Sequence, residues 1–332
     1  MDGSFLSPTG AASRIRPEAE PHMSRERQPE AVVIQTPAKI NLHLEIVGKR
    51  PDGYHDLETL MVAVDLYDEL EFSAAEGMRA VSLTCDQPKL SCGPENLVNR
   101  AAAEIRRRTG NAAGAKIHLR KRIPMQAGLA GGSSDAAATL IGLNRFWNLG
   151  LSTAELAEIG ATIGSDVNFF LDGPCAWCTG RGEKVEPMKV GRQLDFVLAS
   201  PAAGLSTAEV FQRVKVPVKP RTGAEIRNAV GRGDIDEIGR CLFNRLQEPA
   251  EALCPGIRTL RRQLEAANPV AVQMTGSGST VFALCRDRTD AIRVASQLDA
   301  AVSGLPPTTV EGLVPAGGSG NRWKLHYVRS CL

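Results

Sequence analysis

A run of small and hydroxyl residues between a predicted strand and a predicted helix is the first candidate for chemistry in this chain. Residues 124–138 read P-M-Q-A-G-L-A-G-G-S-S-D-A-A-A. Glycine adopts positive φ and lets the backbone approach a ligand closely, and the first turn of a helix offers unpaired N–H groups with about half a unit of positive charge. Such a loop predicts an anion site, typically for a phosphate chain. The alternative is a tight turn with a serine cap.

Two common phosphate motifs do not explain this loop. The chain contains no G-x-x-x-x-G-K-[ST], and no G-x-G-x-x-G follows a strand. A second Gly/Ser run, T-G-S-G-S-T, occupies residues 275–280. If the loop at 124–138 binds a nucleotide, it must use a phosphate-binding motif other than these two.

Three separate polar clusters favour phosphoryl transfer: Lys39 with Asn41, the loop at 124–134, and Asp166. Lys39 and Asn41 follow a Pro-Ala turn on the polar face of a predicted strand, a face that could instead be a solvated edge. Asp166 lies in G-S-D-V-N, where it could instead cap the following apolar turn. Phosphoryl transfer needs a carboxylate to orient the acceptor hydroxyl and cations to neutralise the phosphoryl oxygens. On this interpretation Asp166 faces the hydroxyl, and Lys39 stabilises both Asp166 and the transferring group.

The elements that must position these groups alternate between strand and helix. Hydrophobic periodicity predicts a first block of strands at 32–35, 38–47, 57–66, 70–72, 80–84 and 116–122, a hairpin at 175–179 and 184–188, and helices at 96–108, 136–147 and 152–163. A second block has strands at 194–199, 270–273, 280–284 and 308–313, and helices at 207–213, 224–230, 250–267 and 290–298. This βαββαβ-like order predicts a small antiparallel sheet covered by helices.

Length and composition suit an ordinary globular protein with two domains. The 332 residues are 43% hydrophobic and 23% charged, and a net charge of +2 gives no sign of nucleic acid or an anionic membrane as partner. No apolar run reaches the ~18 residues of a membrane span. Of the eight cysteines, Cys175 and Cys178 form a C-x-x-C pair whose side chains would face opposite ways on a strand. Buried thiols in a reducing cytosol are therefore expected rather than a metal or redox site.

The chain divides into four parts on this evidence. Residues 1–30 are rich in Pro, Ser, Glu and Arg, which predicts a disordered tail, and Met23 is an alternative start. This tail has no secretory apolar segment and is too acidic for an organellar presequence, so a cytoplasmic location is expected. We expect an N-terminal ATP-binding and catalytic domain at 31–190, a C-terminal substrate-side domain at 191–313, and a loose tail at 314–332.

Three motifs in this order resemble those of the GHMP small-molecule kinases. They are P-A-K-I-N-L-H-L at 37–44, the loop at 124–138, and T-G-S-G-S-T at 275–280. The resemblance is strongest to members that act on 4-diphosphocytidyl-2-C-methyl-D-erythritol in the non-mevalonate isoprenoid pathway. Supporting runs are D-G-Y-H at 52–55, E-N-L-V at 95–98, G-S-D-V-N-F-F at 164–170 and G-R-G-E at 180–183. The resemblance covers roughly residues 31–313, with Ala130 where many members carry glycine.

The resemblance implies a fold and a reaction. The fold is α+β, a two-domain GHMP kinase fold with an N-terminal domain like the second domain of ribosomal protein S5 and a ferredoxin-like C-terminal domain. The reaction moves the γ-phosphate of ATP, with Mg²⁺, to the 2-hydroxyl of a small-molecule substrate that carries a cytidine diphosphate group. The sequence assigns no Mg²⁺ ligand and leaves the oligomeric state open.

The resemblance also implies roles for individual residues. Asp166 would be the catalytic base and Lys39 its partner, while Tyr54, His55 and Phe211 would bind cytosine. The implied substrate site consists of Asn41, Tyr54, His55, Phe211, Gly276 and Ser277. The implied ATP site consists of Asn96, near the adenine, and of Pro124, Met125, Gln126, Ala127, Gly128, Leu129, Ala130, Gly131, Gly132, Ser133 and Ser134.

Three other functions are compatible with parts of the pattern. A GHMP kinase for mevalonate, homoserine or a sugar is disfavoured by K-I-N-L and D-G-Y-H, and a catalytically dead nucleotide-binding module by the presence of both Lys39 and Asp166. A nucleic-acid binder is suggested only by the fold shared with a ribosomal protein, and the chain has no basic patch with interleaved aromatics. For Tyr54 the alternative role is that of a half-buried strand residue.

Overall fold

The computed structural model describes residues 31–75, 77, 79–201, 204–303 and 323–332. The predicted N-terminal tail and the strand predicted at 308–313 lie outside these residues.

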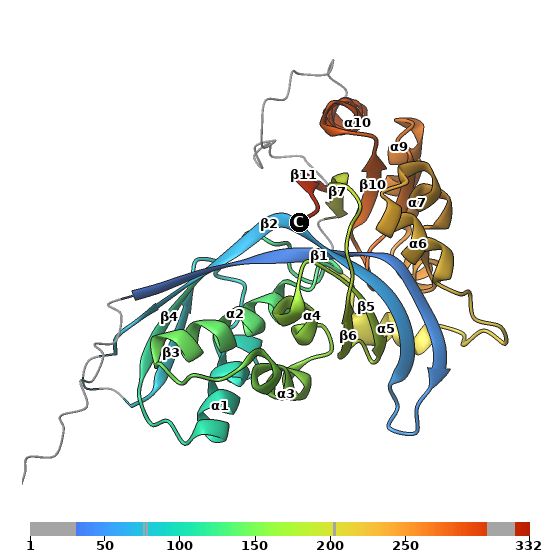
Figure 1. Cartoon of the computed structure of the whole chain (residues 1–332). Coiled ribbons are helices and arrows are strands. Elements are labelled where there is room, and N and C mark those ends of the chain that lie inside the picture. Colours follow the sequence, from blue (N-terminus) through green and yellow to red (C-terminus); the bar gives the residue numbers. More distant parts are fainter. Residues whose placement is uncertain (1–30, 76, 78, 202–203, 304–322) are drawn as a thin grey trace, which may run out of the picture.

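Two long antiparallel strands, β1 (Ala31–Lys49) and β2 (His55–Ser73), run through the whole molecule (Figure 1). The predicted break between the strands at 32–35 and 38–47, where Pro37 lies, is wrong. Proline has no N–H to donate to a ladder and is confined to edges and bulges, and here a register shift between Pro37 and Ala38 accommodates it within one continuous strand. A second shift separates Asn41 from His43.

The first sheet is built around these strands. Its order is β3 (Val81–Cys85), β4 (Ala115–Arg120), β2, β1 and β8 (Phe243–Asn244), and β5 (Cys175–Gly180) joins β2 to β6 (Lys184–Pro187). One edge of β2 changes partner, from β4 at residues 69–73 to β5 at residues 57–62. Between these stretches the Asp68 carboxylate accepts hydrogen bonds from the N–H groups of Arg122 and Ile123, at 2.6 and 2.9 Å. These bonds fix the start of the glycine-rich loop to the sheet.

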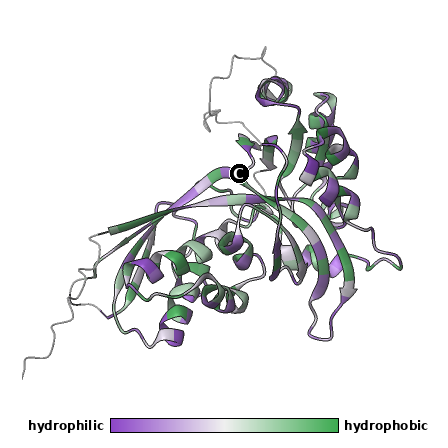
Figure 2. Ribbon diagram, viewed as in Figure 1, coloured by the Kyte–Doolittle hydropathy of each residue, from purple (hydrophilic) through white to green (hydrophobic). Residues whose placement is uncertain are grey.

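Helices α1 (Leu97–Thr109), α2 (Gly131–Phe146), α3 (Thr153–Ile163) and α4 (Val167–Asp172) pack together beneath the long strands (Figure 1). Helix α1 combines hydrophobic and hydrophilic residues, as expected when one face is buried (Figure 2), whereas α2 is buried along most of its length. Their core includes Phe72, Ile105 and Phe146. A capping box of Ser152 and Glu155 begins α3, close to the start of the helix predicted at 152–163. Helix α2 begins five residues before its predicted start, because its first turn consists of the small residues of the loop.

The second sheet has the order β11 (Trp323–Arg329), β7 (Asp195–Pro201), β10 (Val281–Cys285) and β9 (Ala271–Met274), with every pair antiparallel. This is the ferredoxin-like arrangement, in which the first and third strands lie at the centre. The predicted loose tail is therefore wrong for residues 323–329. Their backbone pairs with β7 along its whole length, and Leu325 and Tyr327 pack against the core of this half.

The helices of the second half are α5 (Thr207–Arg213), α6 (Ala224–Arg232), α7 (Ile235–Cys241), α8 (Gln247–Leu253), α9 (Pro255–Ala266) and α10 (Arg288–Ser303). A single helix was predicted over 250–267, but the structure has two. Proline disfavours the helical conformation in the residue before it and suits the first position of a helix. Cys254 accordingly leaves the helical region, with φ −132° and ψ 88°, and Pro255 begins α9.

The C-x-x-C pair is structural. Cys175 and Cys178 are both buried on β5 and belong to different core clusters, which confirms that they face opposite sides of the strand. Burial raises the pKa of both thiols, so they are protonated at neutral pH.

Candidate active site

A cleft of about 1480 Å³ brings together residues from both halves of the molecule. Its lining includes the polar part of β1, the glycine-rich loop, the residues just before α4, the turn between β1 and β2, and Gly276 and Ser277 of the T-G-S-G-S-T run. The cleft has room for two substrates, since pockets for single small molecules measure roughly 300–1,000 Å³.

Lys39 is a buried cation that lines the cleft. Only 3% of the residue is exposed, and its Nζ donates hydrogen bonds to Asn41 Oδ1 at 2.7 Å and to the carbonyl oxygen of Gly128 at 3.1 Å. The Asp166 Oδ2 atom lies 3.6 Å from the same Nζ. Asn41 is only 2% exposed. The alternative of a solvated strand edge is therefore wrong for this pair.

Asp166 faces Lys39 rather than capping a helix. It occupies the position before α4, but its side chain makes no capping hydrogen bond. The side chain remains 30% exposed and lines the cleft. A carboxylate held beside a buried ammonium, yet open to the cleft, can approach the hydroxyl of a bound alcohol.

The two glycine-rich loops touch each other, one from each half of the molecule. Gly128 has φ +77° and Gly276 has φ +56°, a region that favours glycine. A Cβ on Gly128 would lie 2.3 Å from the Thr275 carbonyl oxygen, and a Cβ on Gly276 would lie 2.7 Å from the Gly128 carbonyl oxygen. Both positions need glycine because of this approach of one backbone to the other.

The start of helix α2 provides the predicted anion site. Ala130 adopts φ 55° before the helix and makes no side-chain capping bond, so the N–H groups of the first turn are available to a ligand. Gly132 is exposed in the cleft, and a Cβ built on it would meet only Leu97, at 3.5 Å. The absence of a side chain there leaves the backbone open to a phosphate.

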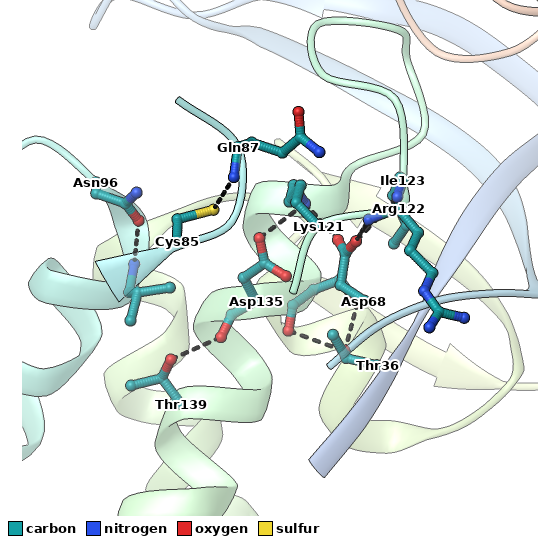
Figure 3. A network of polar contacts seen from close by, with 12 residues as sticks. Thr36, Asp68, Cys85, Gln87, Asn96, Lys121, Arg122, Ile123, Asp135 and Thr139 are labelled. Carbon is teal, nitrogen blue, oxygen red and sulfur yellow. Dashed lines mark hydrogen bonds and ion pairs between the residues drawn. The ribbon is translucent and has the colours of Figure 1, made fainter. Parts of the chain in front are cut away.

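A buried charge cluster lies directly beneath this helix start (Figure 3). The Lys121 ammonium contacts Asp68 on β2 and donates to Asp135 Oδ2 on α2 at 2.8 Å. Burial alone would lower the pKa of Lys121, but the two neighbouring carboxylates outweigh this effect and raise the pKa. Burial raises the pKa of Asp135. The cluster ties both ends of the glycine-rich loop to the sheet.

One end of the cleft is lined by residues before and at the start of α1. Asn96 Oδ1 accepts a hydrogen bond from the Val98 N–H at 3.0 Å, and its Nδ2 donates to the Ser91 carbonyl at 2.8 Å. Asn96 thus shapes this end while capping α1.

Aromatic residues gather at another part of the cleft. Tyr54 is 56% exposed, and the guanidinium carbon of Arg181 lies 5.2 Å from the centre of its ring. The alternative of a half-buried packing residue is wrong for Tyr54. The His55 and Phe211 rings lie 5.7 Å apart although the residues are distant in sequence. Burial and the nearby Lys49 lower the pKa of His55, so its ring is neutral at pH 7.

The structure brings nearly all the predicted site residues into the cleft, with two exceptions. Leu129 is 1% exposed and packs in the core. Ser134 is fully buried, and its hydroxyl donates to the Pro37 carbonyl at 2.6 Å, so it fastens α2 to β1. Neither side chain lines the cleft, so the prediction that these two residues bind ATP could hold only for their backbone atoms.

Sequence reasoning missed several residues that line the cleft. They are mostly charged or come from segments interpreted only as turns and helices: Lys49, Lys89, Ser91, Lys121, Asp135, Arg181, Thr207, Gln212 and Val216. Asp135 was detectable as the single charge among the small and apolar residues at 131–143, and Arg181 as the charged member of a Gly-Arg-Gly turn. Lys121 was not, because it lies in the basic run R-K-R at 120–122.

Two negative findings apply to the described part of the chain. There, no three His, Cys, Asp or Glu side chains gather closely enough to hold a metal ion by themselves. Nor do those residues include a helix with the length and apolar character needed to cross a membrane.

Comparison with known proteins follows the same division of the chain. The model of the GHMP kinases N terminal domain matches residues 96–174, and that of the GHMP kinases C terminal domain matches residues 226–304. A 4-diphosphocytidyl-2-C-methyl-D-erythritol kinase of Pelotomaculum thermopropionicum is 43% identical over 265 residues, which are 78% of this chain and 91% of that protein. One of Carboxydothermus hydrogenoformans is 42% identical over 270 residues, 80% and 93% of the two chains.

Solved structures agree with these relatives. A crystal structure of 4-(cytidine 5'-diphospho)-2C-methyl-D-erythritol kinase matches with a TM-score of 0.70 and 31% identity, over 90% of this chain and 99% of that one. A homoserine kinase from Cytophaga hutchinsonii matches with a TM-score of 0.70 but 16% identity, over 92% and 96% of the two chains, and shows the shared fold.

The chain belongs to the GHMP kinase family, and it has that family's two-domain α+β fold. The relatives that it matches at about 40% identity over most of their length are kinases of 4-diphosphocytidyl-2-C-methyl-D-erythritol.

Proposed function

We propose that this protein transfers the γ-phosphate of ATP to the 2-hydroxyl of 4-diphosphocytidyl-2-C-methyl-D-erythritol, with Mg²⁺ as the metal ion. The observation that carries the proposal is the Lys39–Asp166 pair, 3.6 Å apart, in a cleft lined both by an open helix N-terminus and by aromatic residues, of which Tyr54 is exposed. The first of these features suits the phosphates of ATP, and the second suits a cytosine base.

The reaction needs little covalent chemistry from the protein. The acceptor oxygen forms a bond to the γ-phosphorus, the bond from that phosphorus to the β–γ bridging oxygen breaks, and ADP leaves. Asp166 orients the acceptor hydroxyl and receives its proton, and Lys39 stabilises the charge that develops on the phosphoryl oxygens. The N–H groups at the start of α2 hold the other phosphates.

Mg²⁺ fits this arrangement of residues. It is bound in kinase sites by one or two protein oxygens together with substrate phosphates and water, so it requires no cluster of three acidic residues. Ser133 on the first turn of α2 and Asp166 are oxygen groups that line the cleft beside the phosphate site. When bound, Mg²⁺ would neutralise part of the phosphate charge.

The direct test is incubation with ATP, Mg²⁺ and the cytidylyl substrate, with the product detected by phosphorus NMR. We expect a new phosphomonoester signal, and its loss in Asp166→Asn. Parallel reactions with mevalonate, homoserine and a hexose provide the comparison. Turnover of one of these, and not of the cytidylyl compound, would refute the proposed substrate. ATP binding without any turnover would indicate a nucleotide-binding module.

A further inference from the structure

Two buried threonine hydroxyls surround the Asn41 amide, which itself contacts Lys39. Thr59 lies on β2 and is 2% exposed, while Thr275 begins the T-G-S-G-S-T run of the other half and is fully buried. The proposed reaction gives a role to Lys39 and Asp166 but none to either threonine.

Thr59 determines which way the amide faces. Its hydroxyl lies 2.6 Å from the His43 carbonyl, which can only accept, so the hydroxyl hydrogen is used there. The hydroxyl oxygen keeps its lone pairs and accepts a hydrogen bond from Asn41 Nδ2 at 2.8 Å. The amide nitrogen is therefore directed to Thr59, and the amide oxygen is directed to the opposite side.

Thr275 holds the same residue from the other half of the molecule. Its Oγ1 accepts a hydrogen bond from the Asn41 backbone N–H at 3.0 Å and donates one to Asn41 Oδ1 at 3.2 Å. One hydroxyl can do both, since it has one hydrogen and two lone pairs. Main chain and side chain of Asn41 are thus fixed together.

The amide orientation matters because the Lys39 ammonium can only donate. Asn41 Oδ1 accepts from its Nζ at 2.7 Å, and this bond helps to direct the ammonium toward Asp166. A reversed amide would place an NH₂ group against the ammonium. The register shift after Asn41 lies at the same place, and bulges next to active sites commonly redirect side chains.

On the basis of the proposed function, we propose that Thr59 and Thr275 are positioning residues for the phosphoryl transfer. They fix the Asn41 amide with its oxygen toward Lys39, which keeps the ammonium beside Asp166. Because Thr275 belongs to the C-terminal half, a contact between the halves sets the geometry of the catalytic pair.

The chain offers a matched control in the same loop. Thr280 is also fully buried, but its hydroxyl pairs with Ser200 Oγ at 2.7 Å and not with Asn41. Thr275→Val and Thr280→Val therefore remove equivalent hydroxyls, and only the first removes a contact to the catalytic pair. We would measure kcat, the KM for each substrate and the melting temperature of both variants.

We expect kcat to fall roughly tenfold in Thr275→Val, because the substitution removes both hydrogen bonds that this hydroxyl makes to Asn41. Both KM values should stay within about twofold, and Thr275→Ser should restore kcat. Thr280→Val should lower the melting temperature without changing kcat. Equal kcat losses in the two valine variants would overturn the proposal. If Thr275→Val does not fold, the kcat values of Thr59→Val and Thr59→Ser are compared instead. The valine variant should lose kcat and the serine variant should keep it.

A double-mutant cycle with Lys39→Ala separates positioning from general loss of structure. If Thr275 acts through Lys39, Thr275→Val should have no further effect on single-turnover rates once the lysine is absent. An equal effect in both backgrounds would overturn the proposal. The single-turnover rates of the variants are compared with the wild-type rate, using whichever alcohol the wild type phosphorylates. A different acceptor would therefore refute the proposed substrate, but the test of Thr275 could still be made.

Discussion

Removing the exposed ring of Tyr54 tests how the cleft recognises its acceptor. The ring is 56% exposed, and the turn before it is held by other groups: the Asp52 carboxylate accepts from the Tyr54 N–H at 3.1 Å, and Arg50 N–H donates to the Tyr54 carbonyl at 2.8 Å. Truncation leaves these backbone contacts in place. We therefore expect Tyr54→Ala to change the free energy of unfolding by less than about 0.5 kcal/mol.

The expected effect on substrate affinity follows from one stacking contact. Arg181 lies over the ring, 5.2 Å from its centre, so one face is already partly covered by a cation. A single base stacked on the other face contributes about 1–3 kcal/mol. Since about 1.4 kcal/mol corresponds to a factor of ten, the KM for the cytidylyl substrate should rise roughly 5- to 150-fold. The KM for ATP should remain unchanged.

The assay is steady-state kinetics with each substrate varied in turn, together with a thermal melt. Tyr54→Phe is the matched control, because it keeps the ring and removes only the hydroxyl, and it should behave like the wild type. The reasoning is refuted if Tyr54→Ala raises both KM values together, or if its melting temperature falls by several degrees. Tyr54 would then pack against the fold, and cytosine would bind elsewhere.

Four further predictions follow from individual contacts. Asp166→Asn should keep the melting temperature and ATP affinity but lose most of kcat; wild-type kcat would contradict its assignment as base. Gly132→Val should fold, since only Leu97 lies near its Cβ, yet lose ATP binding in calorimetry; retained affinity would mean that the loop binds no phosphate. Ala130→Gly should relieve the φ of 55° and raise stability to urea by up to about 1 kcal/mol, with an unchanged KM for ATP; a stability loss would show that the chain-entropy cost of glycine dominates. Burial lowers the pKa of His43 from 6.5 to about 4. The unfolded chain therefore takes up a proton first, and stability should be complete above about pH 6.5 and fall by up to roughly 3 kcal/mol as the pH drops toward 4. His43→Phe should remove this slope in urea titrations, and an unaltered slope would place its origin in other groups.

The sequence was sufficient for the parts of the site that depend on local pattern. Strand alternation put Lys39 and Asn41 on one face of β1, and the small residues before α2 marked the phosphate loop. These features follow from the two-residue period of strands and from the conformational freedom of glycine. The order of the three motifs indicated the GHMP kinase family, and the comparisons with known proteins confirm it.

The remaining features depend on contacts between segments distant in sequence. Nothing within G-S-D-V-N decides whether Asp166 caps α4 or faces a lysine more than a hundred residues earlier. The β11 segment alternates apolar and polar residues, as W-K-L-H-Y, but its sequence does not show which strand it pairs with, and it joins the sheet along the edge of β7. Ser134 was predicted to bind ATP because it follows the glycine-rich loop in sequence. In the structure the helix directs its hydroxyl toward β1.

The continuity of β1 and β2 limits how this enzyme can move. Val32 and Ile34 pack with the core around α1 and α2, whereas Leu44 and Ile46, on the same strand, belong to the core of the other half. Swinging the halves apart would require breaking hydrogen bonds between the two long strands. The two halves are therefore joined by a continuous pair of strands, where many kinases have a flexible hinge. Opening for product release therefore falls to the rim segments, such as residues 204–216 with the exposed Val216. Catalytic cycling would then depend on movement of α5 and the residues beside it rather than on rotation of domains.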